Sequence, residues 1–104
     1  MKEIHTKINN YNWTIKIDCE KMDNDYLGLT RNSDYTIMIN SDCSDQARSH
    51  ALIHELTHAF MYSNGMMCRD TYSNEDVCEF IACHISSIMK TYKEVMDKYV
   101  QTKK

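Results

Sequence analysis

The chain has 104 residues, of which 42% are hydrophobic and 26% are charged, and its formal net charge is −3. This length and composition predict one globular domain, residues 1–104, and the acidic balance excludes the basic surface that nucleic-acid binding requires. No stretch approaches the roughly 18 apolar residues of a membrane span, so we expect no membrane partner.

The amino-terminal residues and the cysteines indicate the compartment. Residues 1–6 contain no apolar run of the kind found in a secretory leader. The five cysteines form no Cys-x-x-Cys pair, and an odd number of cysteines without a leader favours reduced thiols. We therefore expect a cytoplasmic protein, whose oligomeric state the sequence leaves open.

The first forty residues carry the alternating pattern of β-strands. Residues 4–17 alternate apolar and polar side chains on either side of a turn at residues 9–10. Two further strands are expected at residues 26–31 and 35–40, joined by residues 32–34, where Asn and Asp tolerate turn dihedrals. The pattern predicts a small antiparallel or mixed sheet.

A first helix is predicted from Asp45 to about Tyr62. Residues 41–44 offer side chains that can cap its start, and Asp45 places a negative charge in its first turn. Asn64-Gly65 is a typical helix stop.

A second helix is predicted to open at Ser73, with Asp76 as its capping partner. Its apolar stripe continues to Met96, and residues 101–104 are expected to fray. The predicted fold class is therefore α+β, a small sheet followed by two packed helices.

The first predicted helix contains His54-Glu55-Leu56-Thr57-His58. Residues four apart share one face of a helix, so His54 and His58 can turn a ring nitrogen toward one ion. Glu55 can reach a water on that ion as a general base without binding the metal. Two imidazoles and a third ligand suit Zn²⁺, with one position open for water. We therefore predict zinc-dependent hydrolysis.

The third ligand is expected at the start of the second helix, which a loop of about ten residues can bring beside the end of the first. Glu75 and Glu79 share one face there, whereas Asp76 is turned about 100° away. We predict that Glu75 binds the metal and that Glu79 accepts a hydrogen bond from a zinc-bound histidine. The reverse assignment stays open on spacing alone.

These motifs resemble those of two groups of metallopeptidases. The sequence 54–58 followed by Asn74-Glu75 is similar to the gluzincins, in which the Glu after Asn is the third zinc ligand. Residues 51–60 and 75–82 more closely resemble the small ImmA/IrrE-type metallopeptidases of phages and mobile elements. In that group a Glu ligand is followed four residues later by an Asn or acidic side chain, which matches Glu75 and Glu79.

The resemblance implies a minimal zincin-like domain that binds Zn²⁺ and acts on a protein or peptide substrate, such as a repressor or regulator. The interval between His58 and Glu75 is shorter than the corresponding interval in thermolysin, the best-known gluzincin. The chain also lacks the metzincin pattern, because Met61 stands where that pattern has Gly.

The implied reaction is the hydrolysis of a peptide bond by an endopeptidase. Glu55 takes a proton from water and passes it to the leaving amine. The oxyanion needs one more donor, for which we predict Tyr72, with Tyr35 and Tyr62 as alternatives. An exposed edge, at either residues 28–31 or residues 35–40, is expected to pair with an extended peptide.

The remaining histidines are expected away from the metal. His50 shares the face of His54 and His58, but about 12 Å separates it from His58 at a rise of about 1.5 Å per residue. A His50/His54 pair could bind a metal, but Ala51 would then stand where the base is needed. His84 is expected on the far side of the second helix, and His5 is expected to be exposed.

A function of a different class remains as the alternative, a non-catalytic regulatory or binding protein with a structural zinc between its two helices. Glu55 distinguishes the two functions, because a structural site needs no base beside the ion.

Overall fold

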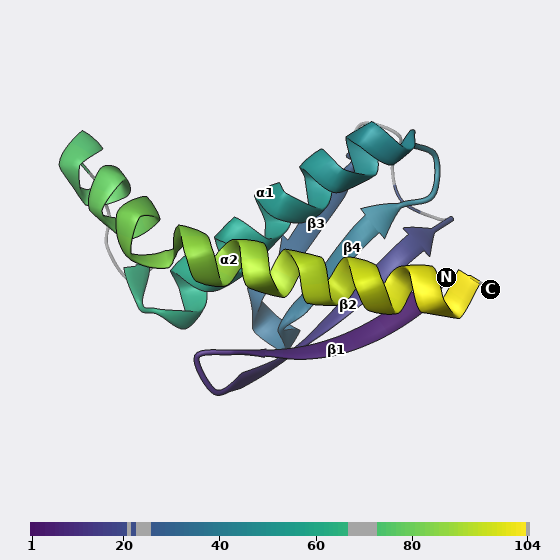
Figure 1. Cartoon of the computed structure of the whole chain (residues 1–104), viewed down its shortest axis with the longest axis horizontal. Helices are drawn as coiled ribbons and strands as arrows, with labels where there is room; N and C mark the ends of the chain where they lie inside the picture. Colours follow the sequence, from purple (N-terminus) through teal and green to yellow (C-terminus); the bar gives the residue numbers. More distant parts are fainter. Residues whose placement is uncertain (21, 23–25, 67–72, 104) are drawn as a thin grey trace.

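The computed structural model describes residues 1–20, 22, 26–66 and 73–103. The elements follow in the order β1 (Lys2–Ile8), β2 (Tyr11–Cys19), β3 (Gly28–Arg31), the 3-10 turn η1 (Asn32–Asp34), β4 (Thr36–Asn40), α1 (Asp45–Ser63) and α2 (Asn74–Lys103). The strands form one sheet, and both helices pack against the same face of it (Figure 1). The α+β fold class predicted from the sequence is confirmed.

The sheet is mixed, with the strand order β1-β2-β4-β3. β1 pairs with β2 and β3 with β4 in the antiparallel sense, whereas β2 and β4 run parallel. β4 is therefore an interior strand, and the expectation that residues 35–40 form an exposed edge is wrong. β3 is the edge beside α1, because β4 already lies between β2 and β3.

The core lies between the sheet and the helices because alternate strand residues point to the same face. Trp13, Ile15 and Ile17 are fully buried on β2, and β4 adds Ile37 and Ile39. From the helices, the fully buried side chains are Leu52, Leu56, Ala59, Ile88 and Val95. The core thus fixes which face of α1 is buried and which remains available.

The amino-terminal end of α1 is attached to the sheet and to α2 through Asp18. A register shift in β2 gives Asp18 a φ of 64°, in the left-handed region. Its carboxylate accepts a hydrogen bond of 2.9 Å from Tyr99 of α2 and lies 3.5 Å from the guanidinium of Arg48 on α1. Arg48 also pairs with Asp45 and lies over the Tyr99 ring, 5.4 Å from its centroid.

The carboxyl-terminal end of α1 is attached to β2 and to the β1–β2 turn. The indole nitrogen of Trp13 donates to Ser63 Oγ at 2.9 Å, and the side-chain amide of Asn9 donates to the Ser63 carbonyl at 2.9 Å. Asn9 and Asn10 both have positive φ, as the predicted turn requires. α1 is thus held at both ends.

Element boundaries differ from the expectations by a few residues. β3 begins at Gly28 rather than residue 26, and α2 continues as a helix to Lys103. In the connection between β3 and β4 the left-handed residue is Tyr35, at φ 54°, instead of an Asn or Asp. The capping box of α2 is confirmed, because Ser73 and Asp76 exchange side chain–main chain hydrogen bonds of 3.0 and 3.1 Å.

None of the helices in the described part of the chain combines the length and apolar character needed to cross a bilayer.

Replacing Ser63 by Ala should lower the free energy of unfolding by about 1–3 kcal/mol, because the buried Trp13 indole N–H would lose its acceptor. Urea unfolding followed by circular dichroism measures this change. Ser86→Ala, at an exposed position of α2, is the control and should change stability by less than about 0.5 kcal/mol. Equal effects of the two substitutions would contradict the role of this hydrogen bond.

Candidate metal centre

His54 and His58 lie on one face of α1, as their spacing predicts. Their Nε2 atoms are 3.2 Å apart, and the ring planes are inclined at 71° with centroids 4.9 Å apart. Two ligand nitrogens bound about 2.0–2.1 Å from a tetrahedral zinc lie roughly 3.3 Å apart. The two rings therefore already have the separation of a metal-chelating pair.

Glu55 has its side chain on the β3 side of α1, next to the histidine pair. Its carboxylate is nearly buried, with 10% of the side chain exposed, whereas 60% of the His54 side chain is exposed. Oε1 accepts a hydrogen bond of 2.7 Å from the Thr30 hydroxyl of β3, and Oε2 lies 3.9 Å from His54 Nε2. The hydrogen bond to Thr30 thus occupies Oε1, and Oε2 is the oxygen that lies near His54.

Gly28 gives Glu55 the room it occupies. A Cβ atom at this position would lie 2.9 Å from Glu55 Cγ and 3.2 Å from Ile39 Cδ1. The first distance is shorter than a side chain tolerates without a shift of its neighbour. Gly28 and Thr30, two residues apart on the same face of β3, therefore form the wall against which Glu55 packs.

Two hollows flank Glu55 between β3 and α1. One, of about 260 Å³, is lined by Tyr26, Leu27, Gly28 and the α1 residues His50, Ala51, His54 and Glu55. The other, of about 290 Å³, is lined by Tyr26, Gly28, Leu29, Thr30, Asn32, Glu55 and His58. The general base predicted from the sequence thus lies in the middle of an open depression along the edge strand.

The carboxylates of α2 do not join the histidine pair. Glu75 and Glu79 are exposed in the first turns of α2, which extend beyond the sheet (Figure 1). Glu79 faces the end of α1 across a hollow of about 350 Å³ that Asn64, Gly65 and Asp76 also line. Within residues 1–20, 22, 26–66 and 73–103, no three His, Cys, Asp or Glu side chains converge closely enough to hold a metal.

Glu79 accepts a hydrogen bond from a cysteine rather than from a histidine. The Cys83 thiol, one turn further along α2, donates to Glu79 Oε1 at 3.2 Å. This hydrogen bond and the negative charge of Glu79 raise the pKa of the Cys83 thiol. The raised pKa favours the neutral thiol of Cys83.

The predicted oxyanion donor, Tyr72, lies outside the described residues. The alternatives Tyr35 and Tyr62 pack in an aromatic cluster in which their ring centroids are 6.0 Å apart, and Tyr35 also stacks on Tyr11 at 5.4 Å. This cluster does not line either hollow beside Glu55.

Of the other histidines, His5 is exposed as expected. His84 does not lie on the far side of α2, because its ring centroid is 6.4 Å from that of Phe60 on α1 and it lines the hollow that Glu79 also lines. His84 packs on Phe80, with ring centroids 4.6 Å apart, and His5 is exposed beside Glu3. His50 lines the hollow that also contains His54.

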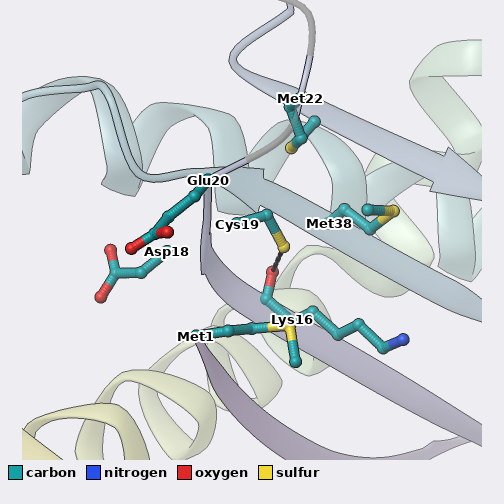
Figure 2. Close-up of a pocket in the computed structure, with 7 residues that line it drawn as sticks. All are labelled: Met1, Lys16, Asp18, Cys19, Glu20, Met22 and Met38. Carbon is teal, nitrogen blue, oxygen red and sulfur yellow. Dashed lines mark hydrogen bonds between the residues drawn. The ribbon is translucent and has the colours of Figure 1, made fainter.

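A further hollow lies away from the histidine pair. Figure 2 shows the side chains of Met1, Met22 and Met38 around Cys19, whose thiol donates to the Lys16 carbonyl at 3.4 Å. The hollow has a volume of about 380 Å³, and none of the motif residues on α1 lines it. Burial raises the pKa of the Cys19 thiol, which favours the neutral form.

Thr30 and Gly28 are not among the site residues predicted from the sequence. A glycine inside a strand is a recognised signal of close approach by another group, and Gly28 carries this signal. The resemblance to the small phage metallopeptidases extends to Gly28-Leu29-Thr30, but it assigns no role to Thr30.

A helix that carries His-Glu-x-x-His and packs beside the edge of a small mixed sheet is a metallopeptidase-like domain. The Peptidase_M78 family model, described as IrrE N-terminal-like domain, matches residues 12–85. The chain therefore belongs to this family, which confirms its resemblance to the ImmA/IrrE-type metallopeptidases. Comparison with curated proteins and with solved structures gave no match.

Replacing Gly28 by Ala should lower the free energy of unfolding by about 1–3 kcal/mol, because the new methyl group overlaps Glu55 and Ile39. Thermal unfolding measured by calorimetry detects the change. Leu29→Ala, on the opposite and exposed side of β3, is the control and should have a smaller effect. A Gly28→Ala variant as stable as the wild type would contradict the close packing of Gly28 against Glu55.

Proposed function

We propose that this protein is a zinc-dependent endopeptidase. The observation that carries the proposal is the nearly buried Glu55 carboxylate beside two histidines whose Nε2 atoms are 3.2 Å apart. Membership of a peptidase family supports the same reaction class.

The metal would be held by His54 and His58, with Glu75 as the third ligand and Glu79 as the residue that orients a ligating histidine. The spacing of the two ring nitrogens fits zinc. The third ligand rests on the sequence motif, and Glu79 is the competing candidate. When bound, zinc would supply polarisation of the scissile carbonyl and a lower pKa of the attacking water.

The chain's own residues would do the proton transfer and the binding of the peptide. Glu55 Oε2 would accept a proton from water and deliver it to the leaving amine. β3 is an edge strand, so its free main-chain groups would pair with an extended substrate. A peptide bound there would lie along the two hollows that flank Glu55. Tyr72 remains the proposed oxyanion donor.

The physiological substrate that we infer is a protein such as a repressor or regulator, met in the cytoplasm. This part of the proposal follows from the family resemblance and from the open edge of β3, which suits an extended segment of a larger chain.

The alternative is a non-catalytic protein with a structural zinc between its helices. Glu55 argues for catalysis, because burying a carboxylate with one hydrogen-bonded oxygen beside the histidines has no benefit for a purely structural ion. The catalytic proposal requires Glu55 as a base, whereas the structural alternative does not. A substitution of Glu55 therefore distinguishes the two functions.

The purified chain should contain stoichiometric zinc when its metal content is measured by elemental mass spectrometry. His58→Ala should reduce the zinc content to background, since the metal would lose one of its three protein ligands. His5→Ala, which changes an exposed histidine beside Glu3 on β1, should leave the zinc content unchanged. A metal-free wild-type chain would contradict the proposal.

Glu75→Ala and Glu79→Ala compare the two carboxylates. Loss of a residue that only orients a ligand costs about 10–100-fold in metal affinity. We expect a loss in this range for Glu79→Ala and a greater loss for Glu75→Ala, measured by competition with a chelator. The opposite order would assign Glu79 as the ligand.

Glu55→Gln should keep the zinc and the fold but reduce hydrolysis by about 10²–10⁴-fold, because the amide cannot accept the proton. Cleavage is measured on a proteome-derived peptide library, in which mass spectrometry identifies the new chain termini whatever the substrate sequence. Undiminished cleavage by this variant would refute the role of Glu55. Zinc binding with no cleavage by the wild type would favour the structural alternative.

A further inference from the structure

The edge strand β3 places a hydroxyl group directly against the proposed general base. Thr30 Oγ1 lies 2.7 Å from Glu55 Oε1 and 3.2 Å from the main-chain oxygen of Glu55. Hydrogen bonds to ionised acceptors are shorter and stronger than those to neutral ones. The hydroxyl therefore donates mainly to the carboxylate oxygen, and its contact with the main-chain oxygen is the longer one.

This hydrogen bond makes the two oxygens of Glu55 unequal. Oε1 accepts from Thr30, whereas Oε2 lies on the side of the histidine pair, 3.9 Å from His54 Nε2. We propose that Thr30 is a positioning residue that fixes the Glu55 carboxylate so that Oε2 faces the reacting water. The inference rests on the proposed peptidase function and names a residue outside the His-Glu-x-x-His motif.

The same contact keeps Glu55 a base instead of a ligand. A glutamate has three rotatable bonds, and one without an anchor can turn an oxygen onto an adjacent metal ion. In this site such a rotation would break the 2.7 Å hydrogen bond and leave the Thr30 hydroxyl only its longer contact, of 3.2 Å, with the Glu55 main-chain oxygen. Gly28 makes this position of the side chain possible, since Glu55 Cγ lies only 2.9 Å from where a Cβ atom at residue 28 would be.

Thr36 supplies a matched control for Thr30. It lies on the neighbouring strand, opposite Arg31 in the register of β3 and β4, and its hydroxyl donates to the Asp34 carbonyl at 3.2 Å. Thr36→Val thus removes a strand hydroxyl of the same sheet without touching Glu55. Thr30→Val removes the hydroxyl near Glu55 and keeps the β-branched shape, and Thr30→Ser retains the hydroxyl.

The experiment measures binding of acetohydroxamate to the zinc-loaded full-length chain by isothermal titration calorimetry. A hydroxamic acid binds zinc through two oxygens and transfers its proton to a carboxylate placed as a general base, so its affinity reports the position of Glu55. We expect Thr30→Val to weaken binding by about tenfold or more, the fold-change that corresponds to one hydrogen bond to a charged group. Thr30→Ser should restore the affinity to within about threefold, and Thr36→Val should leave it unchanged.

The possible outcomes test the positioning role of Thr30 and the proposed peptidase function separately. Equal affinities of the wild type and Thr30→Val, with zinc present in both, would overturn the positioning role of Thr30 and leave the peptidase proposal intact. A wild-type chain that binds neither zinc nor acetohydroxamate would overturn the peptidase proposal itself.

If the wild type binds no zinc, a measurement without metal still tests the hydrogen bond between Thr30 and Glu55. Urea-unfolding midpoints of Thr30→Val, Glu55→Ala and the double variant form a double-mutant cycle. We expect the double variant to shift the midpoint by less than the sum of the single variants. Strictly additive shifts would show that Thr30 does not hold Glu55.

Discussion

The packing of α1 across the inner face of the sheet is the constraint on which the site depends. Leu52 and Leu56 are fully buried, and their positions fix the rotation of the helix about its axis. At that rotation Glu55 lies against β3, while His54 and His58 lie side by side on the flank exposed to solvent. His54 and His58 each lie two positions from Leu52 and Leu56, a turn of about 200° around the helix, so burial of the two leucines turns both histidines away from the core.

The sheet contributes more than a surface for the helix. Because β4 is placed between β2 and β3, the short strand β3 becomes the edge next to α1. Its inward residues, Gly28 and Thr30, shape and orient the base, and its outer edge is available for a peptide. One four-residue strand thus links the position of the general base to the place where an extended substrate would pair.

Most of the fold could be predicted from the sequence because it rests on local periodicity. The alternation in residues 4–17, the capping box at Ser73 and the helix that carries the histidine motif all have local causes, and the structure confirms these elements. The strand order could not be predicted in this way, since pairing of β2 with β4 depends on contacts between distant residues. The expectation of an edge at residues 35–40 fails for this reason. The role of Thr30 could not be found either, because its partner is 25 positions away.

The two halves of α2 pack against the rest of the molecule to different extents. Towards its carboxyl end, Ile88, Val95 and Tyr99 are buried, and Tyr99 is bonded to Asp18. Towards its amino end Phe80 is buried, but Val77, Ile81 and Ile85 remain exposed, so this half packs less of its apolar surface against the body. Amide protons of the first turns should therefore exchange with solvent through local opening, whereas those near Tyr99 exchange only when the whole molecule unfolds. The carboxyl-terminal half of α2 is thus the more firmly packed half. The amino-terminal half, which can open locally, carries Glu75 and Glu79, the carboxylates proposed for the metal centre.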